Sequence, residues 1–290
     1  MAFLSYLIGG LGLGSVYAII ALGYSMVYGI AKMLNFAHGD VIMVGAFVAY
    51  FALSSFGLPT IVALILSVVA CTVLGIVVEK LAYKPLRGAS SLSVLITAIG
   101  VSYFLQNAAM LMWGTDTKIF PTILEGTLTI GELSIPYLTL LTILSCIVIM
   151  IVLTMFINKT KTGRAMRACS EDNGAASLMG INVNQIISIT FAIGSGLAAI
   201  AAVLLCATYP SVYPTLGSMP GIKAFTAAVL GGIGSIPGAF LGGLLLGVIE
   251  NLARAYISTQ LSDAIVFMVL IVILLIKPTG LLGKKVNVKV

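Results

Sequence analysis

The side chains that could take part in chemistry are few in this sequence. His38 is its only histidine, and Asp and Glu together number nine among 290 residues. No two carboxylates are spaced as an acid–base pair, and no nucleophile stands beside a base. The four cysteines form no CxxC pair, and three lie inside apolar runs, which is typical of small buried side chains. These observations do not indicate an enzyme, a disulfide framework or a metal site.

The most polar group next to an apolar run is the segment 35–40, which reads Asn-Phe-Ala-His-Gly-Asp. A polar residue at the membrane is a functional candidate, so Asn35, His38 and Asp40, together with Phe36 and Gly39, are candidates for lining a pathway. The alternative is that Asn35 and His38 hydrogen-bond backbone groups that a broken helix leaves free. The pattern alone favours this second interpretation over direct contact with a solute.

The composition requires that most of the surface face lipid. Hydrophobic residues make up 60% of the chain and charged residues 8%, with a mean hydropathy of +1.17. A soluble domain carries about 25% charged residues. The net charge of +6 does not indicate nucleic acid, because the basic residues lie between apolar runs and no nucleic-acid-binding motif is present. We expect a lipid bilayer as the partner of this surface.

The apolar runs predict an all-α, polytopic membrane bundle, because in lipid every backbone amide must be hydrogen-bonded. A helix needs about 20 apolar residues to cross a membrane. The runs are 5–31, 41–78, 88–115, 137–157, 186–208, 224–249 and 264–276. Gly57-Leu58-Pro59 divides the second run, and the last run is expected to start near Ser258. This gives about eight or nine membrane elements in one transmembrane domain, 1–290.

The N-terminal run is expected to be a true span, since residues 1–13 lack the Lys or Arg of a signal peptide. Basic residues set the orientation. They cluster between the third and fourth spans, between the fifth and sixth, and in the C-terminal tail, whereas Asp116–Pro136 has only Lys118. We therefore expect the N-terminus outside and the C-terminus in the cytoplasm. That parity requires an additional short helix at 221–232 that crosses fully or partly.

The two halves show weak internal symmetry. In the first half a span is followed by the segment 35–40 and another span. In the second half a span is followed by the helix break or gate at Gly234, Pro237 and Gly238, and then by another span. The halves would run in opposite directions, as inverted repeats, and such repeats often place a pathway at interrupted helices. The late glycines at spacing i+4, including Gly243 and Gly247, favour close helix packing.

The segment 159–183 predicts two short helices near 165–168 and 175–179. Gly163 precedes the first, and Gly174 separates the two. Gly180 is placed to end the second, and Ser170, Asp172 and Asn173 supply capping oxygens for it.

The second of these helices would expose Ala175 and Ala176 for close packing against a partner protein. The alternative is a solvated basic loop that only sets the topology.

These strings resemble the LivH/LivM-type permeases, the membrane subunits of branched-chain amino acid ABC importers. The string Gly-Arg-Ala-Met-Arg-Ala beginning at Gly163, with Glu171-Asp172-Asn173 and Gly180-Ile181, resembles the coupling loop of that family. Leu34–Gly39 resembles its Asn-Phe-Ala element, and Gly231–Ala239 its glycine-rich late element. The resemblance covers nearly the whole chain.

The resemblance implies a second related permease subunit, two cytoplasmic ABC ATPases that bind ATP, and a periplasmic or lipid-anchored amino-acid-binding protein, in the inner (plasma) membrane. No cofactor is expected on the chain itself, and it lacks the GxxxxGK[ST] loop, since Pro278 stands where the first glycine would be. The residues that it implies for ATPase coupling are Gly163, Arg164, Arg167, Glu171, Asp172, Asn173, Ala175, Ala176 and Gly180.

Three readings compete with an importer subunit. A stand-alone secondary transporter would carry ionisable residues within its spans, which here are confined to His38 and Asp40 at one edge. A stand-alone channel is compatible with this pattern. The second alternative is a purely structural membrane subunit, against which the interrupted glycine-rich helices argue mildly. The third is a membrane enzyme, which the lack of a catalytic constellation disfavours. Because permeases for urea and short amides share the same elements, the resemblance identifies the class of machine better than its cargo.

Overall fold

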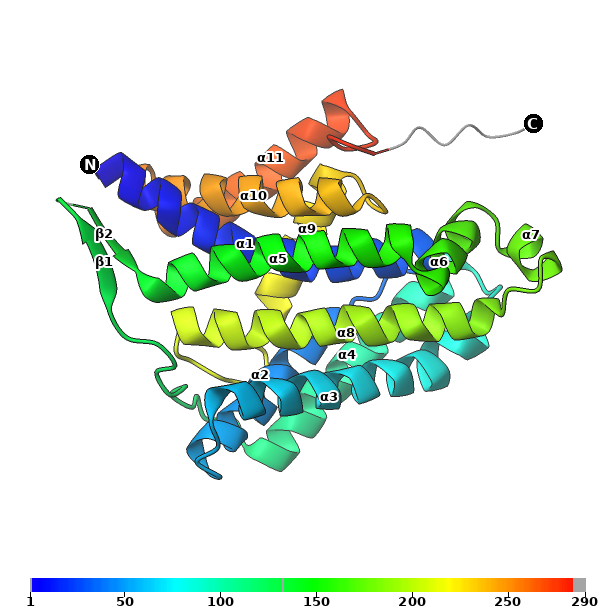
Figure 1. Ribbon diagram of the computed structural model, residues 1–290, viewed down its shortest axis with the longest axis horizontal. Helices are drawn as coiled ribbons and strands as arrows, with labels where there is room; N and C mark the ends of the chain where they lie inside the picture. The colour runs from blue at the N-terminus through cyan, green and yellow to red at the C-terminus, as the bar shows by residue number, and fades with distance from the viewer. Residues whose placement is uncertain (1, 132, 284–290) are drawn as a thin grey trace.

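The computed structural model describes residues 2–131 and 133–283, and this part of the chain forms a helical bundle (Figure 1). Its nine apolar helices are α1 (Ala2–Ala31), α2 (His38–Ser54), α3 (Thr60–Val78), α4 (Ser91–Trp113), α5 (Tyr137–Lys159), α8 (Val183–Thr208), α9 (Ser218–Gly231), α10 (Ile236–Tyr256) and α11 (Ser262–Ile276). Six helices are long and apolar enough to cross a membrane, namely α1, α3 with its extension to Leu86, α4, α5, α8 and α10. The predicted all-α membrane bundle is confirmed.

Local sequence explains where the helices begin and end. The chain turns between α2 and α3 at Gly57, which has φ +59°, and Pro59 directly precedes α3, as the Gly-Leu-Pro signal predicts. Ser90 caps α4 by accepting a hydrogen bond from the Ser93 amide at 3.2 Å, and Gly114 with φ +84° ends that helix. The α3 helix continues beyond its regular part as a π-helical turn, η1 (Glu79–Tyr83), and a 3₁₀ turn, η2 (Lys84–Leu86), neither of which the sequence predicted.

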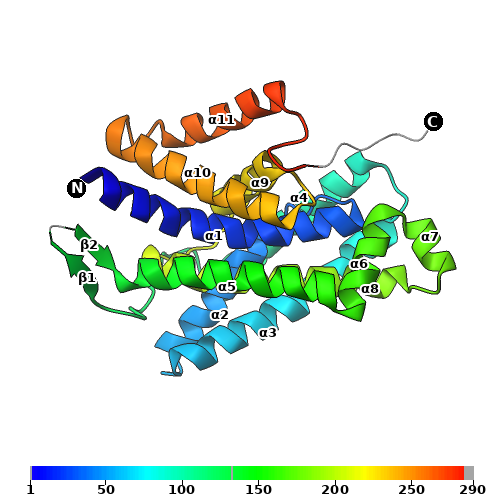
Figure 2. The same ribbon diagram turned by 45° about the horizontal axis from the view of Figure 1, so that its top comes forward.

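The bundle has two distinct ends (Figures 1 and 2). At the hairpin end, β1 (Thr127–Ile130) and β2 (Leu133–Pro136) form an antiparallel pair that the all-α prediction did not include. At the opposite end, called the α7 end, lie α6 (Lys161–Glu171) and α7 (Asn173–Leu178). The chain starts at the hairpin end, and α11 leads to the α7 end. The basic tail residues beyond 283 lie outside the described residues.

The short helix α9 supplies the additional partial crossing that places the two ends of the described chain on opposite sides of the bundle. It covers Ser218–Gly231, close to the 221–232 helix that the sequence predicts, and it starts in the interior and runs to the α7 end. Residues 209–217 bring the chain into the interior from the hairpin end. Residues 209–217 also pair with the loop after α4, because the Lys118 amide donates to the Val212 carbonyl at 2.8 Å.

The packing follows an inverted repeat in which α1–α4 correspond to α8–α11. Helix α1 packs against α10, and its counterpart α8 packs against α3. In the same way α2 contacts α8 while α9 contacts α1, and α2 contacts α4 while α9 contacts α11. Helix α5 connects the two repeats. The first two pairs of contacts lie between the repeats and the third lies within each repeat, and a pseudo-two-fold axis in the membrane plane relates all three.

The structure corrects one detail of that repeat. The sequence pairs the segment 35–40 with the glycines at 234–238, but the counterpart of 32–37 in the structure is 209–217. The segment 234–238 instead covers the end of the turn between α9 and α10 and the start of α10, where Ser235 is the N-cap and Pro237 lies in the first turn. The glycine pattern misled the assignment because close helix packing and a broken helix both require glycine.

The late glycines pack helices together, as predicted. In the crossing of α1 and α10, a Cβ added to Gly243 would overlap Ala18, and one added to Gly247 would overlap Gly14. A Cβ on Gly242 would meet the Ala227 carbonyl of α9. Small residues at spacing i+4 on both helices let the backbones approach this closely, which favours association where no hydrophobic effect operates between lipid-facing helices.

Candidate functional site

Two partial helices meet with their N-termini in the interior of the bundle. After α1 ends, the chain turns back, and the ring of His38 at the start of α2 lies beside Gly23. Gly23 is eight residues before Ala31, so at 1.5 Å per residue the chain returns about 12 Å along α1. The start of α9 meets it there, because a Cβ at Gly39 or at Gly217 would overlap the backbone of the other. Both N-termini direct their positive dipole ends toward this junction.

The structure brings Asn35, Phe36, His38 and Gly39 to this junction, as the sequence pattern suggests. Asn35 is buried, and its Oδ1 accepts a hydrogen bond from the Tyr83 hydroxyl at 2.8 Å. The His38 ring packs edge-on against Tyr24 with centroids 4.6 Å apart. Its Nε2 has no hydrogen-bond partner among residues 2–131 and 133–283. The roles of these residues in a pathway stay a prediction.

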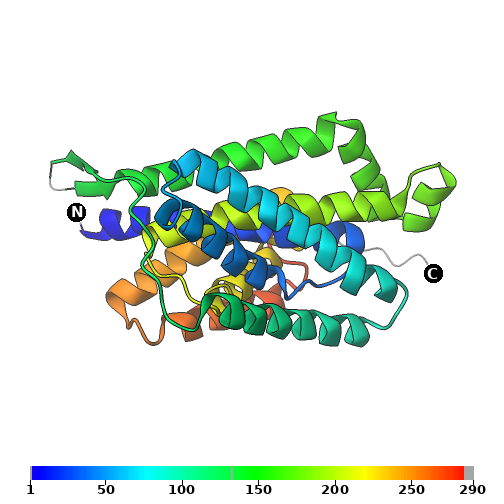
Figure 3. The ribbon, with the colours of Figure 1, turned by 90° about the horizontal axis from the view of Figure 1, so that it is seen from below.

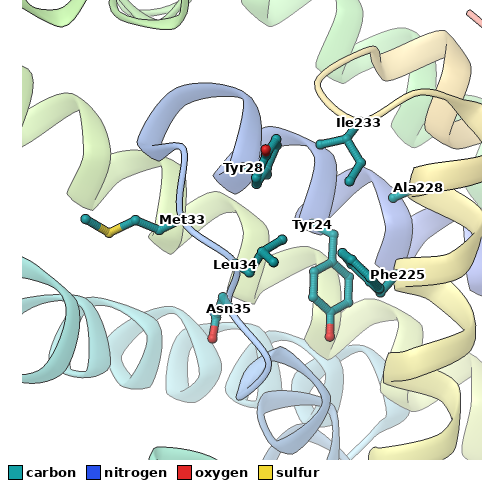
Figure 4. Close-up of a pocket in the computed structure, with 8 residues that line it drawn as sticks. All are labelled: Tyr24, Tyr28, Met33, Leu34, Asn35, Phe225, Ala228 and Ile233. Carbon is teal, nitrogen blue, oxygen red and sulfur yellow. The ribbon is translucent and has the colours of Figure 1, made fainter. Parts of the chain in front are cut away.

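A small pocket lies beside the junction, between the two repeats (Figure 4). Its cavity volume is about 10 Å³, which is room for about one water molecule. One wall comes from the end of α1 and the loop after it, and the other from α9 and the turn that follows. Its lining residues are Tyr24, Tyr28, Met33, Leu34, Asn35, Phe225, Ala228 and Ile233. The cavity therefore marks the interface between the two repeats, but in this conformation it has no room for an amino acid.

A polar cluster that the sequence analysis missed completes the junction. Gln106 of α4 donates from Nε2 to Asp40 Oδ1 at 2.8 Å, to Ser102 Oγ at 3.2 Å and to Ser218 Oγ at 3.3 Å. Asp40 lies in the first turn of α2 and Ser218 in the first turn of α9, so Gln106 links both partial helices. Besides Asp40, the signal in the sequence was Gln106 with its neighbour Asn107 in the charge-free run 88–115.

Two further carboxylates are buried, each with an arginine. Glu79 of η1 pairs with Arg87 and accepts a hydrogen bond from the Ser188 hydroxyl at 2.6 Å, which joins α3 to α8. Glu250 of α10 pairs with Arg254, as the i, i+4 spacing predicts.

Glu250 also receives the Lys223 ammonium at 2.7 Å, and Lys223 reaches Asp263 of α11 at 2.6 Å. This corrects the prediction that ionisable groups within the membrane elements are confined to His38 and Asp40, since buried Lys223 lies in the second turn of α9.

The α7 end presents two short helices, as the segment 159–183 predicts, although their limits differ. Helix α6 begins at Lys161 and already contains Gly163, whose added Cβ would overlap the end of α5. The helices separate at Asp172 rather than at Gly174, because Asp172 Oδ1 caps α7 by accepting from the amides of Gly174 at 2.7 Å and Ala175 at 3.0 Å. Gly180, with φ +79°, follows α7 as predicted.

Most of the residues that were predicted to face outward on α6 and α7 are exposed. Arg164, Arg167 and Glu171 are exposed on α6, while Met166 and Cys169 are buried on its other side. Burial raises the pKa of the Cys169 thiol above its ordinary value. Ala175 is exposed, but Ala176 is buried, which corrects the expectation that both face outward. Asp172 and Asn173 are also exposed.

The sequence analysis overlooked an exposed apolar pair beyond α7. Leu178 is 90% exposed and Met179 82% exposed, at the tip of the α7 end. Because this tip projects past the apolar helices, these side chains are candidates for contact with another protein.

Comparison with known proteins agrees with this architecture. A family described as "Branched-chain amino acid transport system / permease component" matches residues 6–274. The chain belongs to this family. It is 48% identical to the high-affinity branched-chain amino acid transport system permease protein BraD of Pseudomonas aeruginosa, over 97% of this chain and 96% of BraD.

It is likewise similar to the permease protein LivH of high-affinity branched-chain amino acid transport systems. The identity is 44% to LivH of both Salmonella typhimurium and Escherichia coli K12, over 97% of this chain and 96% of each relative. As a member of this permease family the chain is a transport component. The resemblance drawn from the segments 34–39, 163–183 and 231–239 is thereby confirmed.

Proposed function

We propose that this chain is a transmembrane permease subunit of an ATP-driven importer that carries leucine, isoleucine and valine into the cytoplasm. The observation that carries this proposal is the 48% identity to BraD across 97% of the chain. The fold adds support, since two interrupted helices meet inside an inverted repeat, an arrangement that transporters use for alternating access.

The importer requires other subunits. A second related permease lies beside this chain, two ABC ATPases bind ATP in the cytoplasm, and a periplasmic or lipid-anchored binding protein delivers the amino acid. The chain itself uses no cofactor and acts as one permease domain over 1–290. It sits in the inner membrane with the N-terminus outside and the α7 end in the cytoplasm, because the basic residues of η1, η2, α5 and α6 lie at that end.

The ATPase binds the face formed by α6 and α7. Arg164, Arg167 and Glu171 supply charged contacts on one side of α6, and Leu178 with Met179 supplies the apolar contact. Asp172, Asn173 and Ala175 lie between them. Gly163 allows α6 to pack closely against the end of α5, and Gly180 follows α7 with φ +79°. ATP binding closes the ATPase pair and moves this face, which shifts the population of the spans between outward and inward access.

The movement reaches the junction through packed elements. Helix α6 contacts α1, α5 and α8, and α1 carries Tyr24 beside His38. Asn35, Phe36, His38 and Gly39 then lie along the pathway. The turn at Gly234, Pro237 and Gly238 acts as a gate, where the Gly234 amide donates to Ser25 of α1 at 2.9 Å.

Uptake by purified complexes tests the cargo. The chain is reconstituted in proteoliposomes with its neighbouring permease, ATPases and binding protein, and labelled leucine, isoleucine, valine and urea are offered separately. We expect uptake of the three amino acids and none of urea. Uptake of urea alone would overturn the assigned cargo while retaining the importer, and replacing Arg164 by Glu should abolish uptake without preventing insertion.

A further inference from the structure

The buried carboxylates of the bundle differ in their pairing. Glu79, Glu250 and Asp40 are 0%, 0% and 2% exposed. Glu79 and Glu250 each form ion pairs with an arginine. Asp40 forms no ion pair with any of residues 2–131 and 133–283, and its side-chain hydrogen-bond partners there are neutral, namely the Gln106 amide at 2.8 Å and the Ser102 hydroxyl. A buried carboxylate without a cation is costly, and within a membrane such a group is characteristic of a functional site.

Asp40 is also close to the outer face of the bundle. Gln106, Ser102 and Ser218, which surround it, are each partly exposed, and Asn107 and Tyr103 of α4 are exposed. In the view from below, α4 lies along the face where α9 begins (Figure 3). Ser102 is at the midpoint of α4 (Ser91–Trp113), so this polar face lies midway across the membrane. Some of these groups bond to one another, as the Asn107 amide does to the Tyr103 carbonyl, but contact with lipid would leave their remaining donors and acceptors unsatisfied.

We propose that Asp40, positioned by Gln106 and Ser218, binds the ammonium group of the transported amino acid on a polar face formed by α4 and the first turns of α2 and α9. This assignment rests on the proposed function. A carboxylate has about four acceptor positions, of which Gln106 and Ser102 occupy two. The ammonium of a zwitterionic amino acid supplies the cation that Asp40 lacks. The dipoles of α2 and α9 favour the accompanying carboxylate nearby.

Thiol labelling tests the charge of this face without relying on the cargo. Ser102→Cys is made in the chain, assembled in the complete importer, and treated with cationic and anionic methanethiosulfonate reagents. The wild type serves as blank because its four cysteines are buried. Phe104→Cys is the matched control, since Phe104 is 70% exposed and lies about 200° around the helix from Ser102, toward lipid.

We expect Ser102→Cys to react at least tenfold faster with the cationic reagent than with the anionic one, and Phe104→Cys to react with neither. Adding Asp40→Asn should bring the two rates at Ser102→Cys close together. The proposal is overturned if Ser102→Cys is as unreactive as Phe104→Cys, or if the preference for the cation survives Asp40→Asn.

Uptake tests the ammonium contact itself. Asp40→Asn should lower leucine uptake at least tenfold while the importer assembles and the binding protein still stimulates its ATPase, and Asp40→Glu should restore part of the uptake. Asp116→Asn, at an exposed loop position, should leave uptake unchanged. Loss of assembly together with uptake in Asp40→Asn would overturn the assignment and give Asp40 a structural role. Absence of leucine uptake by the wild type would instead overturn the proposed function, and the labelling ratio would still decide whether Asp40 selects cations.

Discussion

The backbone of Gly39 lies directly against the backbone of Gly217, where α2 and α9 begin. The two residues are far apart in the sequence and belong to different repeats. Their contact joins the repeats at the point where both interrupted helices start, so relative movement of the repeats must pass through it.

Substitution of either glycine should disturb this junction. Gly39→Ala places a Cβ 2.5 Å from the Gly217 carbonyl oxygen, a backbone atom that cannot rotate away. We expect a loss of stability of about 1–3 kcal/mol, as for other overpacked sites, measured by thermal unfolding in detergent. Gly100→Ala in α4 is the control, because no atom lies within 4 Å of its added Cβ. Equal midpoints for the two variants would contradict the close contact.

The pair between Glu79 and Arg87 predicts a specific pattern of variants. Arg87→Gln leaves the Glu79 carboxylate buried without a cation, and breaking a buried pair in this way costs about 3–5 kcal/mol. The double variant Glu79→Gln with Arg87→Gln removes both charges and should recover most of that loss. Unfolding midpoints of the single and double variants check this, and additive effects would show that the two side chains do not interact.

Lys223 should contribute more to stability than its partner Asp263. Lys223→Met leaves Glu250 with Arg254 alone and removes the link from α9 to α10 and α11. Asp263→Asn should have a small effect, because the Asp263 side chain is 40% exposed whereas that of Glu250 is 0% exposed. Thermal unfolding midpoints of the two variants show which substitution destabilises the protein more. A larger loss of stability for Asp263→Asn than for Lys223→Met would refute the prediction.

The apolar tip of the α7 end should be required for ATPase binding. Leu178→Asp places a charge where an apolar contact is expected, and we predict at least a tenfold loss of ATPase co-purified with the permease. Ile119→Asp is matched in chemistry and is 80% exposed in the wild type, but lies on the loop after α4 at the hairpin end. If both variants retain the ATPase equally, the docking face is elsewhere.

Much of the fold could be predicted because lipid imposes simple rules. Charge-free runs of sufficient length marked the spans, Gly57-Leu58-Pro59 marked a turn, and the parity of the basic residues required the short helix that the structure shows as α9. These inferences depend on local composition, which lipid constrains strongly.

The candidate site was harder to predict because it depends on contacts between distant segments. Nothing local to Gly217 indicates that it meets Gly39, and nothing local to Gln106 indicates that it reaches both Asp40 and Ser218. Lys223 was read as the edge of an apolar run because its carboxylate partners, Glu250 and Asp263, come much later in the chain. Ala176 was expected outside because a short helix alone does not reveal which face its neighbours cover.

Leucine uptake into proteoliposomes tests the central claim most directly. The complete importer is compared with this chain alone, each with and without ATP on the side of the ATPases, and with the binding protein on the opposite side. The account predicts uptake only when the other subunits, the binding protein and ATP are all present. Leucine uptake by this chain alone without ATP would contradict it and identify a stand-alone carrier or channel.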